Sequence, residues 1–434
     1  MNLPWSGRTR LLLGPEGLAD WLSYAPVGRA SVLVDPALTG ARITGLVEDE
    51  LARAGHLVRR LVPEGPGDAT EILDLAARTA RSELIVAIGG GTCVDRAKLA
   101  LLAGDSPAAA QALTTRTRCG LLALDQAVRR VRPLLAVPTT VGPGSELSRV
   151  ACMPHRQGKR LVSAEALTPD AALLDPAATE TLPAELLAEG VLEALFRTVT
   201  PYAGDHKELP VEDAFCEAAA AQLAGLGHRV AELRAAGRPL DAGLRLDVAR
   251  LSGLTHAPWM RLGRSPFTTE GWIIANELST ALGIRKMTAV AALLPHLWRA
   301  VLDGDERYGS AERLHRIWQR IREGLPYGLP ADPADGIAAL VDAWRIGRHV
   351  AADPARLAAV ARQTTRAWGA GLPMLGGLLT ADVEALLVRT CATGTATGTT
   401  STTTATASDA PAAPRTGPAA QHAPARPLTD FRAA

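Results

Sequence analysis

A glycine triplet between an apolar run and a helical pattern is the feature that most constrains the fold of this chain. Residues 84–98 read LIVAIGGGTCVDRAK, and the run at 84–88 is apolar throughout, as is typical of a strand buried in a parallel sheet. The triplet at 89–91 carries no Cβ, so its N–H groups can approach a ligand closely. Thr92 is the predicted N-cap of a helix at 95–103. Strand, turn and helix N-terminus together predict a diphosphate cradle, and a tight turn without a ligand is the alternative.

The segments around this cradle alternate between short apolar runs and amphipathic patterns, which predicts a doubly wound parallel sheet. The predicted strands are 30–34, 56–62 and 134–137, and the predicted helices are 41–55 and 70–80. From Pro183 onward the periodicity is helical only, with predicted helices at 183–199, 211–235, 241–262, 268–282, 287–302, 309–323 and 335–347. We therefore expect an α/β nucleotide-binding domain at 1–178 and an all-α domain at 179–390.

The composition mainly excludes classes of protein. The 434 residues are 47% hydrophobic, which is enough for a large core. The net charge of +1 leaves no electrostatic footprint for nucleic acid or an anionic membrane. The five cysteines form no C-x-x-C pair, and the apolar runs are too short for a signal peptide or a membrane helix, so we expect a cytoplasmic protein. The Thr/Ala/Pro-rich segment 391–434 is predicted to be a disordered tail.

A carboxylate follows the strand predicted at 30–34. Asp35 would lie at the carboxyl end of that strand, where a dinucleotide's ribose hydroxyls bind. A carboxylate there would repel a 2′-phosphate and favour NAD over NADP. The alternative is an ordinary turn-initiating Asp before Pro36.

A second loop, PTTVGPGSE at 138–146, follows the strand predicted at 134–137. The proline stop, the paired hydroxyls of Thr139 and Thr140 and the glycines are typical of a loop along a cofactor at the carboxyl end of a strand. An ordinary polar loop has the same composition. Lys159 is expected in a polar turn further on, where a solvated surface lysine is the common case.

Taken together, these elements resemble the iron-containing alcohol dehydrogenase family, a branch of the dehydroquinate synthase-like superfamily. GGGTCVDRAK is similar to the family's Gly-Gly-Gly-Ser-x-x-Asp-x-x-Lys element, and PTTVGPGSE to its Pro-Thr-Thr-x-Gly-Thr-Gly-Ser-Glu element. LTPDAALLDPAATETLP at 167–183 and LLPH at 293–296 match the family's domain junction and a later helix. The resemblance implies an N-terminal Rossmann-like domain and a C-terminal helical domain, with NAD(P) in the cleft between them.

By position, the resemblance also assigns cofactor-binding residues. It implies that Gly90, Gly91 and Thr92 bind the diphosphate and that Thr139 and Thr140 line the cofactor. It further implies that Asp35 binds the adenine ribose and that Asp95 and Lys159 lie near the nicotinamide. Pro143 stands where the family has threonine, which removes one expected cofactor hydrogen bond.

The chain departs from the family at the metal site. The metal-containing relatives use an Asp and three His ligands, and the corresponding positions here hold Glu193, Arg197, Trp272 and Lys286. Asn276 replaces a further histidine. Protonated guanidinium and ammonium groups cannot coordinate a metal ion. We therefore expect no bound metal, and we expect the remaining histidines of this part, His256 and His296, to be packed or capping residues.

The replacements have two interpretations. In the first, Glu193 and Arg197 form an ordinary i, i+4 helix pair, Lys286 fills the vacated cation site, and the cluster is a relic. In the second, fixed cations have taken over the electrostatic role of the metal. Lys286 would stabilise an alkoxide or act as an acid or base, while Arg197 would pair with Glu193 or bind a substrate carboxylate. We favour the second, with Lys286, Arg197 and Glu193 as the candidate catalytic residues.

The leading hypothesis is a metal-independent, NAD-dependent dehydrogenase acting on a secondary alcohol or the matching carbonyl of a small-molecule or peptide substrate. One branch similar to this family oxidises the C-terminal threonine of a ribosomal peptide in daptide-type biosynthesis, and two cations would suit its carboxylate. A non-catalytic NAD-binding subunit of a biosynthetic complex is the alternative from another class. A carbocycle-forming synthase like dehydroquinate synthase would need a metal. A homodimer is one possible assembly.

Overall fold

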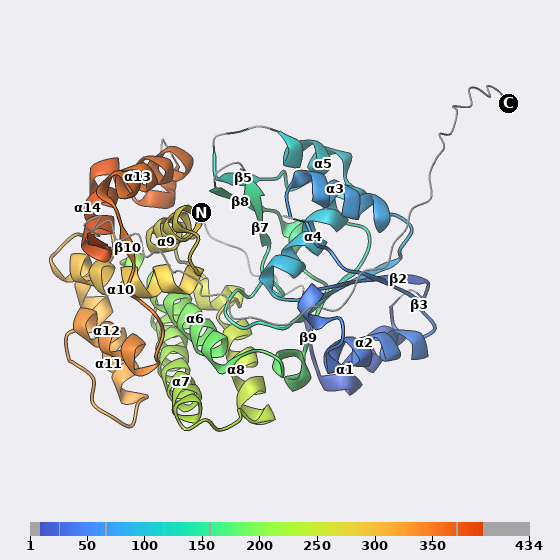
Figure 1. Cartoon of the computed structure of the whole chain (residues 1–434), viewed down its shortest axis with the longest axis horizontal. Coiled ribbons are helices and arrows are strands. Elements are labelled where there is room, and N and C mark those ends of the chain that lie inside the picture. The colour runs from blue at the N-terminus through green and yellow to red at the C-terminus, as the bar shows by residue number, and fades with distance from the viewer. Residues whose placement is uncertain are drawn as a thin grey trace, which may run out of the picture. The chain divides into compact units, whose positions relative to one another are not determined.

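The computed structural model describes residues 9–393 except 26, 66, 116, 118, 156–157 and 370–371. The α/β part is built on six parallel strands in the order β1-β9-β6-β4-β2-β3. Figure 1 labels β2, β3 and β9 of this sheet and the helices α1 to α5 of the same part. The strands are β1 (Arg10–Leu13), β2 (Arg29–Val34), β3 (Leu57–Leu61), β4 (Leu84–Gly89), β6 (Leu134–Pro138) and β9 (Ala171–Leu174). The helices of this part are α1 (Gly14–Ser23), α2 (Arg42–Arg53), α3 (Ala69–Arg78), α4 (Gly91–Asp105) and α5 (Pro107–Thr114).

Strand β4 lies inside the sheet and is buried on both faces. Successive side chains of a strand point to opposite faces, and here Ile85 and Ala87 pack with α3, α4 and α5, while Val86 and Ile88 pack with α1 and α2. This two-sided burial is the reason that the run at 84–88 is apolar without interruption.

The sheet reverses its strand order between β2 and β4. From β2 the chain moves outward to β3, and it then returns to pair β4 with the other side of β2. Dinucleotides bind at such a switch point, outside the carboxyl ends of the strands. Asp35 and Gly89 lie at this point, and the Asp35 N–H donates to the Ile88 carbonyl at 2.9 Å.

A smaller sheet of three strands follows, β5 (Leu121–Ala123), β8 (Gly158–Ser163) and β7 (Val150–His155). Lys159 belongs to β8, opposite Pro154 of β7. The expectation of a polar turn at Lys159 is therefore wrong, because residues 158–163 are held in β8 by pairing with β7.

The C-terminal part is helical, with α6 (Ala184–Gly204), α7 (Pro210–Ala235), α8 (Ala242–Leu254), α9 (Glu270–Leu282), α10 (Lys286–Leu302), α11 (Ala311–Glu323), α12 (Pro333–Ala343), α13 (Pro354–Trp368) and α14 (Thr380–Thr390). Its apolar core includes an edge-on pair of Trp298 and Trp318, whose ring centroids are 5.8 Å apart. Helix α8 ends at Leu254 rather than near 262, because Pro258 has no N–H to donate and disfavours a helical residue before it. A short 3₁₀ helix, η4 (Pro258–Arg261), follows.

The predicted fold class, an α/β Rossmann-like part followed by an all-α part, is confirmed. The boundary at 178/179 stays a prediction. Cys391 is buried, and β11 (Ala392–Thr393) pairs with β10 (Ala351–Ala352), so ordered chain extends into the first three residues of the predicted tail. The rest of that tail, 394–434, lies outside the described residues. Among those described, no helix is both long and apolar enough to cross a membrane.

Candidate active site

The turn between β4 and α4 forms the predicted cradle. Helix α4 begins at Gly91 with Gly90 as its N-cap, and no side chain caps it. The prediction that Thr92 is the N-cap is therefore wrong, and Thr92 is an exposed residue in the first turn of the helix. The first N–H groups of a helix have no partner within it, and here they remain available to an anion.

The loop after β6 lies directly against the cradle. The Thr139 N–H donates to the Gly89 carbonyl at 3.0 Å, which continues the strand pairing into the loop. A Cβ on Gly90 would lie 3.1 Å from the Thr140 methyl carbon, and one on Gly91 would lie 3.0 Å from Pro143. Larger residues at 90 and 91 would press on this loop, so the glycines allow its close approach.

Asp35 lies at the end of β2 and uses one carboxylate oxygen as a cap. Oδ1 accepts a hydrogen bond of 3.0 Å from the Ala37 N–H. The turn role that the sequence offered as an alternative is thus present. A ribose role is compatible with it, because a carboxylate has a second oxygen.

The predicted nicotinamide-side residue Asp95 is directed into the protein. The carboxylate accepts from the Ser145 hydroxyl and from the Cys152 N–H at 2.9 Å, and it lies 3.9 Å from Lys98 Nζ. Burial raises the pKa of Asp95 and lowers that of Lys98 to about 8. Lys98 also donates to the Ser148 carbonyl at 2.8 Å. Both residues fasten β7 and the second loop to α4.

The three candidate catalytic residues meet in one cluster. Glu193 Oε1 accepts from Lys286 Nζ and, at 3.3 Å, from Arg197 Nη2. Glu193 and Arg197 are buried on α6, while the Lys286 side chain, at the start of α10, is 28% exposed. Burial lowers the pKa of Arg197 to about 10, and Glu193 opposes that shift. The structure thus confirms that the three side chains lie together, and only Lys286 stays open to solvent.

Trp272 forms an aromatic face for this cluster. Its ring lies 5.2 Å from Lys286 Nζ and 5.8 Å from the Arg197 guanidinium carbon. The ring also packs on Phe196, with centroids 4.6 Å apart. Cations near an aromatic face are stabilised by its quadrupole, so Trp272 stabilises both Lys286 and Arg197.

Arg197 joins the cluster to the second loop. Nη2 donates to the Gly142 carbonyl, and Nη1 donates to Thr255 Oγ1 at 3.2 Å. The Gly142 N–H donates to Ser252 Oγ at 2.9 Å. A Cβ on Gly142 would lie 2.9 Å from the α-carbon of Gly190 on α6, so the two backbones are in direct contact. Both Nη atoms of Arg197 therefore bind protein acceptors, which makes it a positioning residue.

Cys152 lies beside Asp95, one of the predicted cofactor-binding residues, and its N–H donates to that carboxylate. The sequence did not indicate this residue. Burial raises the pKa of its thiol to about 12, with Asp95 and Glu193 acting in the same direction and Lys159 and Lys286 opposing them. The thiol is therefore within electrostatic range of residues from both sets. A scattered cysteine in the sequence carries no signal of this position.

His256 is the second residue that the sequence undervalued. Its ring packs on Gly144, where a Cβ would lie 1.8 Å from Nε2, and Gly144 has a φ of +61°. The buried Nε2 of the ring has no hydrogen-bond partner in the described part of the chain. Burial, followed by the charges of Arg197, Arg261 and Lys98, lowers the pKa of His256 well below 6.5. The imidazole is therefore neutral at neutral pH.

The cluster does not fit a metal ion. Glu193 is its one metal-binding side chain, and it is already paired with two cations. Nowhere in the described ranges do three or more His, Cys, Asp or Glu side chains form a group that could hold a metal. The nucleotide cradle, by contrast, has the free N–H groups and the open backbone that a dinucleotide diphosphate requires.

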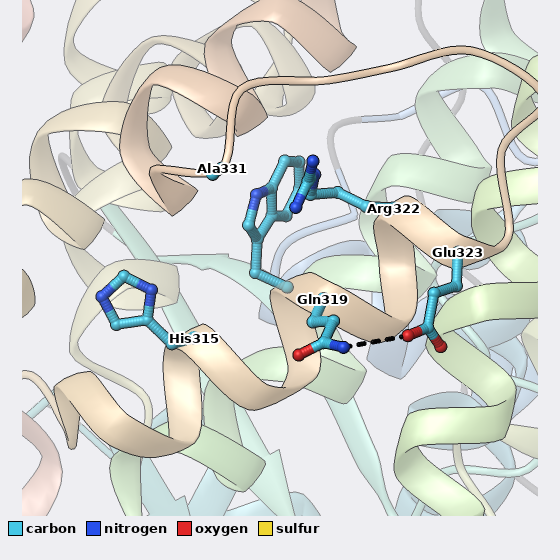
Figure 2. A pocket seen from close by; sticks show the side chains of 6 residues that line it. His315, Gln319, Arg322, Glu323 and Ala331 are labelled. Atoms are coloured by element: carbon cyan, nitrogen blue, oxygen red, sulfur yellow. Dashed lines mark hydrogen bonds between the residues drawn. The ribbon is translucent and has the colours of Figure 1, made fainter.

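Two cavities of the helical part are lined by residues outside this cluster. One of about 390 Å³ is lined by α11 residues and Ala331, and Figure 2 shows His315, Gln319, Arg322 and Glu323 around it. The Gln319 amide donates to Glu323 at 3.1 Å on its rim. None of these residues contacts the cradle or the Glu193 cluster in any recorded interaction.

Comparison with known proteins agrees with this site. The profile of the family described as "Iron-containing alcohol dehydrogenase" matches residues 9–176. The chain is 31% identical over 278 residues to the probable alcohol dehydrogenase EutG of Salmonella typhimurium, covering 60% of this chain and 67% of that protein. It is 27% identical over 271 residues to long-chain-alcohol dehydrogenase 1 of Geobacillus thermodenitrificans, covering 61% of this chain and 64% of that protein. The chain thus spans about two thirds of these relatives.

Two further comparisons cover more of the chain. The NADPH-dependent aldehyde reductase YqhD of Escherichia coli is 25% identical over 325 residues, covering 73% of this chain and 80% of that protein. The crystal structure of the NADH-dependent butanol dehydrogenase A of Thermotoga maritima superposes with a TM-score of 0.75 at 16% identity, over 90% of this chain and 99% of that one. The latter supports the fold alone. With the matched profile and the glycine and threonine loops, these relatives show that the chain belongs to the iron-containing alcohol dehydrogenase family, whose members are alcohol and aldehyde oxidoreductases.

Proposed function

We propose that this chain is an NAD-dependent oxidoreductase that interconverts a secondary alcohol and its carbonyl without a bound metal. The observation that carries the proposal is the pairing of Glu193 with Lys286 and Arg197. An unpaired buried carboxylate is costly, and the two side-chain cations supply the counter-charge that an ion would otherwise provide.

The cradle and the switch point support NAD as the cofactor. The N–H groups at the start of α4 would hold the diphosphate, with Thr139, Thr140 and Lys159 along its path. Asp35 would accept from the adenine ribose and disfavour a 2′-phosphate. A bound nicotinamide would supply the hydride acceptor or donor.

Lys286 is the residue we propose to contact the reacting oxygen. Its ammonium has three donors, one of which binds Glu193, so two remain for a substrate oxygen. A positive donor at that oxygen stabilises the alkoxide character that develops during hydride transfer. Glu193 and Arg197 fix the position of the ammonium, and Trp272 covers one side of it.

The substrate class remains part of the proposal. A small hydroxy compound or the C-terminal threonine of a ribosomal peptide, as in daptide-type biosynthesis, would suit a cleft rich in cations. We also propose a cytoplasmic location, for which the five unpaired cysteines are the support, and a homodimer as the assembly.

Metal analysis of purified protein combined with NADH absorbance tests this function. We expect less than stoichiometric iron and zinc, turnover that survives EDTA, and loss of turnover in Lys286→Ala. Lys207→Ala is the matched control, because Lys207 is an exposed lysine whose ammonium contacts the Gly263 carbonyl and nearby Asp205, neither of them a candidate site residue. Stoichiometric metal, with activity lost to EDTA and restored by the metal, would contradict the proposal.

A non-catalytic NAD-binding subunit is the second candidate. The observation in its favour is that two predicted site residues, Asp95 and Arg197, already use their side chains for hydrogen bonds to other parts of the protein. NADH binding by calorimetry, without hydride transfer to any alcohol or carbonyl tested, would identify this function.

A further inference from the structure

A second cavity of the helical part, with a volume of about 220 Å³, is lined by His296, Arg348 and His349, and we call it the His296 pocket. His296 lies on α10, whereas Arg348 and His349 come from the segment before β10. Thr390 and Ala392, from the end of α14 and from β11, also line it. No carboxylate is among the described side chains around this pocket, and its volume is sufficient for a phosphate-sized ion.

The two imidazoles of the pocket are free to bind a ligand. Neither ring makes a hydrogen bond to a described residue. His349 is exposed, and the ring nitrogens of half-buried His296 are not among the buried atoms that lack a partner, so both rings are accessible. Thr390 differs, because its hydroxyl donates to the Leu386 carbonyl at 2.8 Å. Each neutral imidazole has one N–H donor, and each protonated imidazole has two.

Arg348 adds a guanidinium that the protein uses only in part. Its Nε and Nη2 donate to the two carboxylate oxygens of Asp342 at 2.7 and 2.8 Å. Nη1 makes no hydrogen bond to a described residue. Asp342 is also in electrostatic range of His349. The ion pair fixes the plane of the guanidinium, so little further freedom is lost when Nη1 binds a ligand.

The surroundings of His296 favour an anion over a metal cation. Burial lowers the pKa of its imidazole, and the charges of Arg389 and Arg348 act in the same direction. Positive groups of this kind repel a cation and attract an anion. In addition, the described part of the chain contains no group of three or more His, Cys, Asp or Glu side chains that could hold a metal ion.

The carboxylates beyond the pocket are already bound to arginines. Asp342 is paired with Arg348, and Asp305, which is in electrostatic range of Arg389, is paired with Arg307. The arginines near the pocket are therefore largely balanced while the imidazoles are neutral. A bound anion gains a full counter-charge when an imidazole takes up a proton, so its binding should strengthen as the pH falls.

We propose that the His296 pocket binds a tetrahedral oxyanion, a phosphate or sulfate group, through the two imidazoles and Arg348 Nη1. The donors come from α10 and from the segment 348–349, and an anion with four oxygens can accept from both. Ala392 of β11 lines the same pocket, and its N–H donates to the Val350 carbonyl at 2.9 Å. A bound ion should therefore join α10 to the β10–β11 pair and stabilise the fold.

Calorimetric titration of sulfate into the full-length protein with saturating NADH tests this site. NADH is added because the diphosphate cradle would also bind sulfate. We expect one sulfate per chain and an association constant that rises about threefold or more from pH 8 to pH 6, where sulfate keeps its charge. Inorganic phosphate and glycerol 3-phosphate should also bind. The tighter of the two identifies the ligand as a free ion or an ester, whereas acetate bound as tightly as sulfate would overturn the inference.

Variants of the pocket separate a built site from general salt effects. His296→Gln should lower the association constant about tenfold or more, because a charged donor is lost. His315→Gln is the control, at an exposed histidine of α11, and should change it less than about twofold. Asp342→Asn should raise it about threefold or more, because a negative charge is lost while asparagine can still accept from Arg348. A gain of this kind does not arise from damage to the fold.

Thermal unfolding at pH 6 measures the effect on stability. Sulfate should raise the melting temperature of the wild type more than that of His296→Gln, and this difference removes the general effect of the salt. The absence of saturable sulfate binding at pH 6 would overturn the inference. Binding that both His296→Gln and Asp342→Asn leave unchanged would do so as well, and so would saturable binding of Zn²⁺ in place of sulfate.

Discussion

Lys286 donates to Glu193 from a helix that begins 93 residues further along the chain. By the resemblance to the family, Glu193 and Lys286 occupy two of the four positions that hold metal ligands in the metal-containing relatives. In this structure the two side chains bind each other. The pair thus keeps a positive group at this position.

Removing the ammonium should abolish most turnover without weakening the cofactor. We expect Lys286→Gln to lower kcat by about 10²- to 10³-fold, as the loss of an oxyanion donor typically does. The NADH dissociation constant should change by less than about twofold, because Lys286 hydrogen-bonds to Glu193 and, among the described residues, to none of the diphosphate cradle. Stopped-flow absorbance and fluorescence titration measure the two quantities. An unchanged kcat would mean that the cluster is a structural relic.

Removing the charge of Asp35 should relax the choice of cofactor. We expect Asp35→Asn to raise the affinity for NADPH about tenfold or more, because the repulsion of the 2′-phosphate is lost. Asparagine can still accept from the Ala37 N–H, so the cap and the turn are retained. Affinities for NADH and NADPH, measured side by side, check this, and equal selectivity in variant and wild type would assign Asp35 to the turn alone.

Gly144 should be far less tolerant than a glycine of the same backbone conformation elsewhere. Gly144→Ala would set a methyl group against His256, and we expect a loss of about 2–4 kcal/mol in unfolding free energy. Gly237→Ala is the matched control, since Gly237 has a φ of +63° and nothing within 4 Å of the added Cβ. The control isolates the cost of the left-handed backbone, at about 1–2 kcal/mol.

The double variant Gly144→Ala, His256→Ala tests the same contact by a thermodynamic cycle. Removing the ring should recover the part of the loss that exceeds the control, as measured by urea unfolding. A strictly additive result would show that the ring is not the cause of the constraint.

Glu270 should make stability depend on pH between weakly acidic and neutral conditions. Burial raises the pKa of this carboxyl from its ordinary 4.5 to about 7, so the folded state prefers the protonated form. Its contribution is therefore present below about pH 4.5 and is lost as pH rises through about 7. Glu270→Gln should flatten the melting temperature over this window, while Glu16→Gln, at an exposed first-turn position of α1, should not.

Local chemistry explains what could be predicted from the sequence. The cradle at Gly90 and Gly91 and the loop at Thr139 and Thr140 depend on neighbouring residues and backbone freedom, and the structure has both where expected. Helices α6, α7, α9, α10 and α11 follow from apolar periodicity. Helix α13 was missed although Asp353 and Pro354 supply a cap and a first-turn proline.

The remaining site residues depend on contacts between distant segments. Cys152 and His256 carry no motif, and the position of each depends on the segments packed around it. The hydrogen bonds of Asp95 with Ser145 and Cys152 likewise join segments more than 45 residues apart. No local sequence pattern therefore predicts that this carboxylate faces inward.

The contact of Gly142 with Gly190 has a mechanical consequence. Neither glycine has a side chain at this contact, and Arg197 on α6 also donates to the Gly142 carbonyl, so we expect the two backbones to turn about this point rather than to slide past each other. Under the proposed function, release of the dinucleotide is then expected to proceed as a rotation with its pivot at these α-carbons. A single methyl group on either glycine would force the second loop and helix α6 apart.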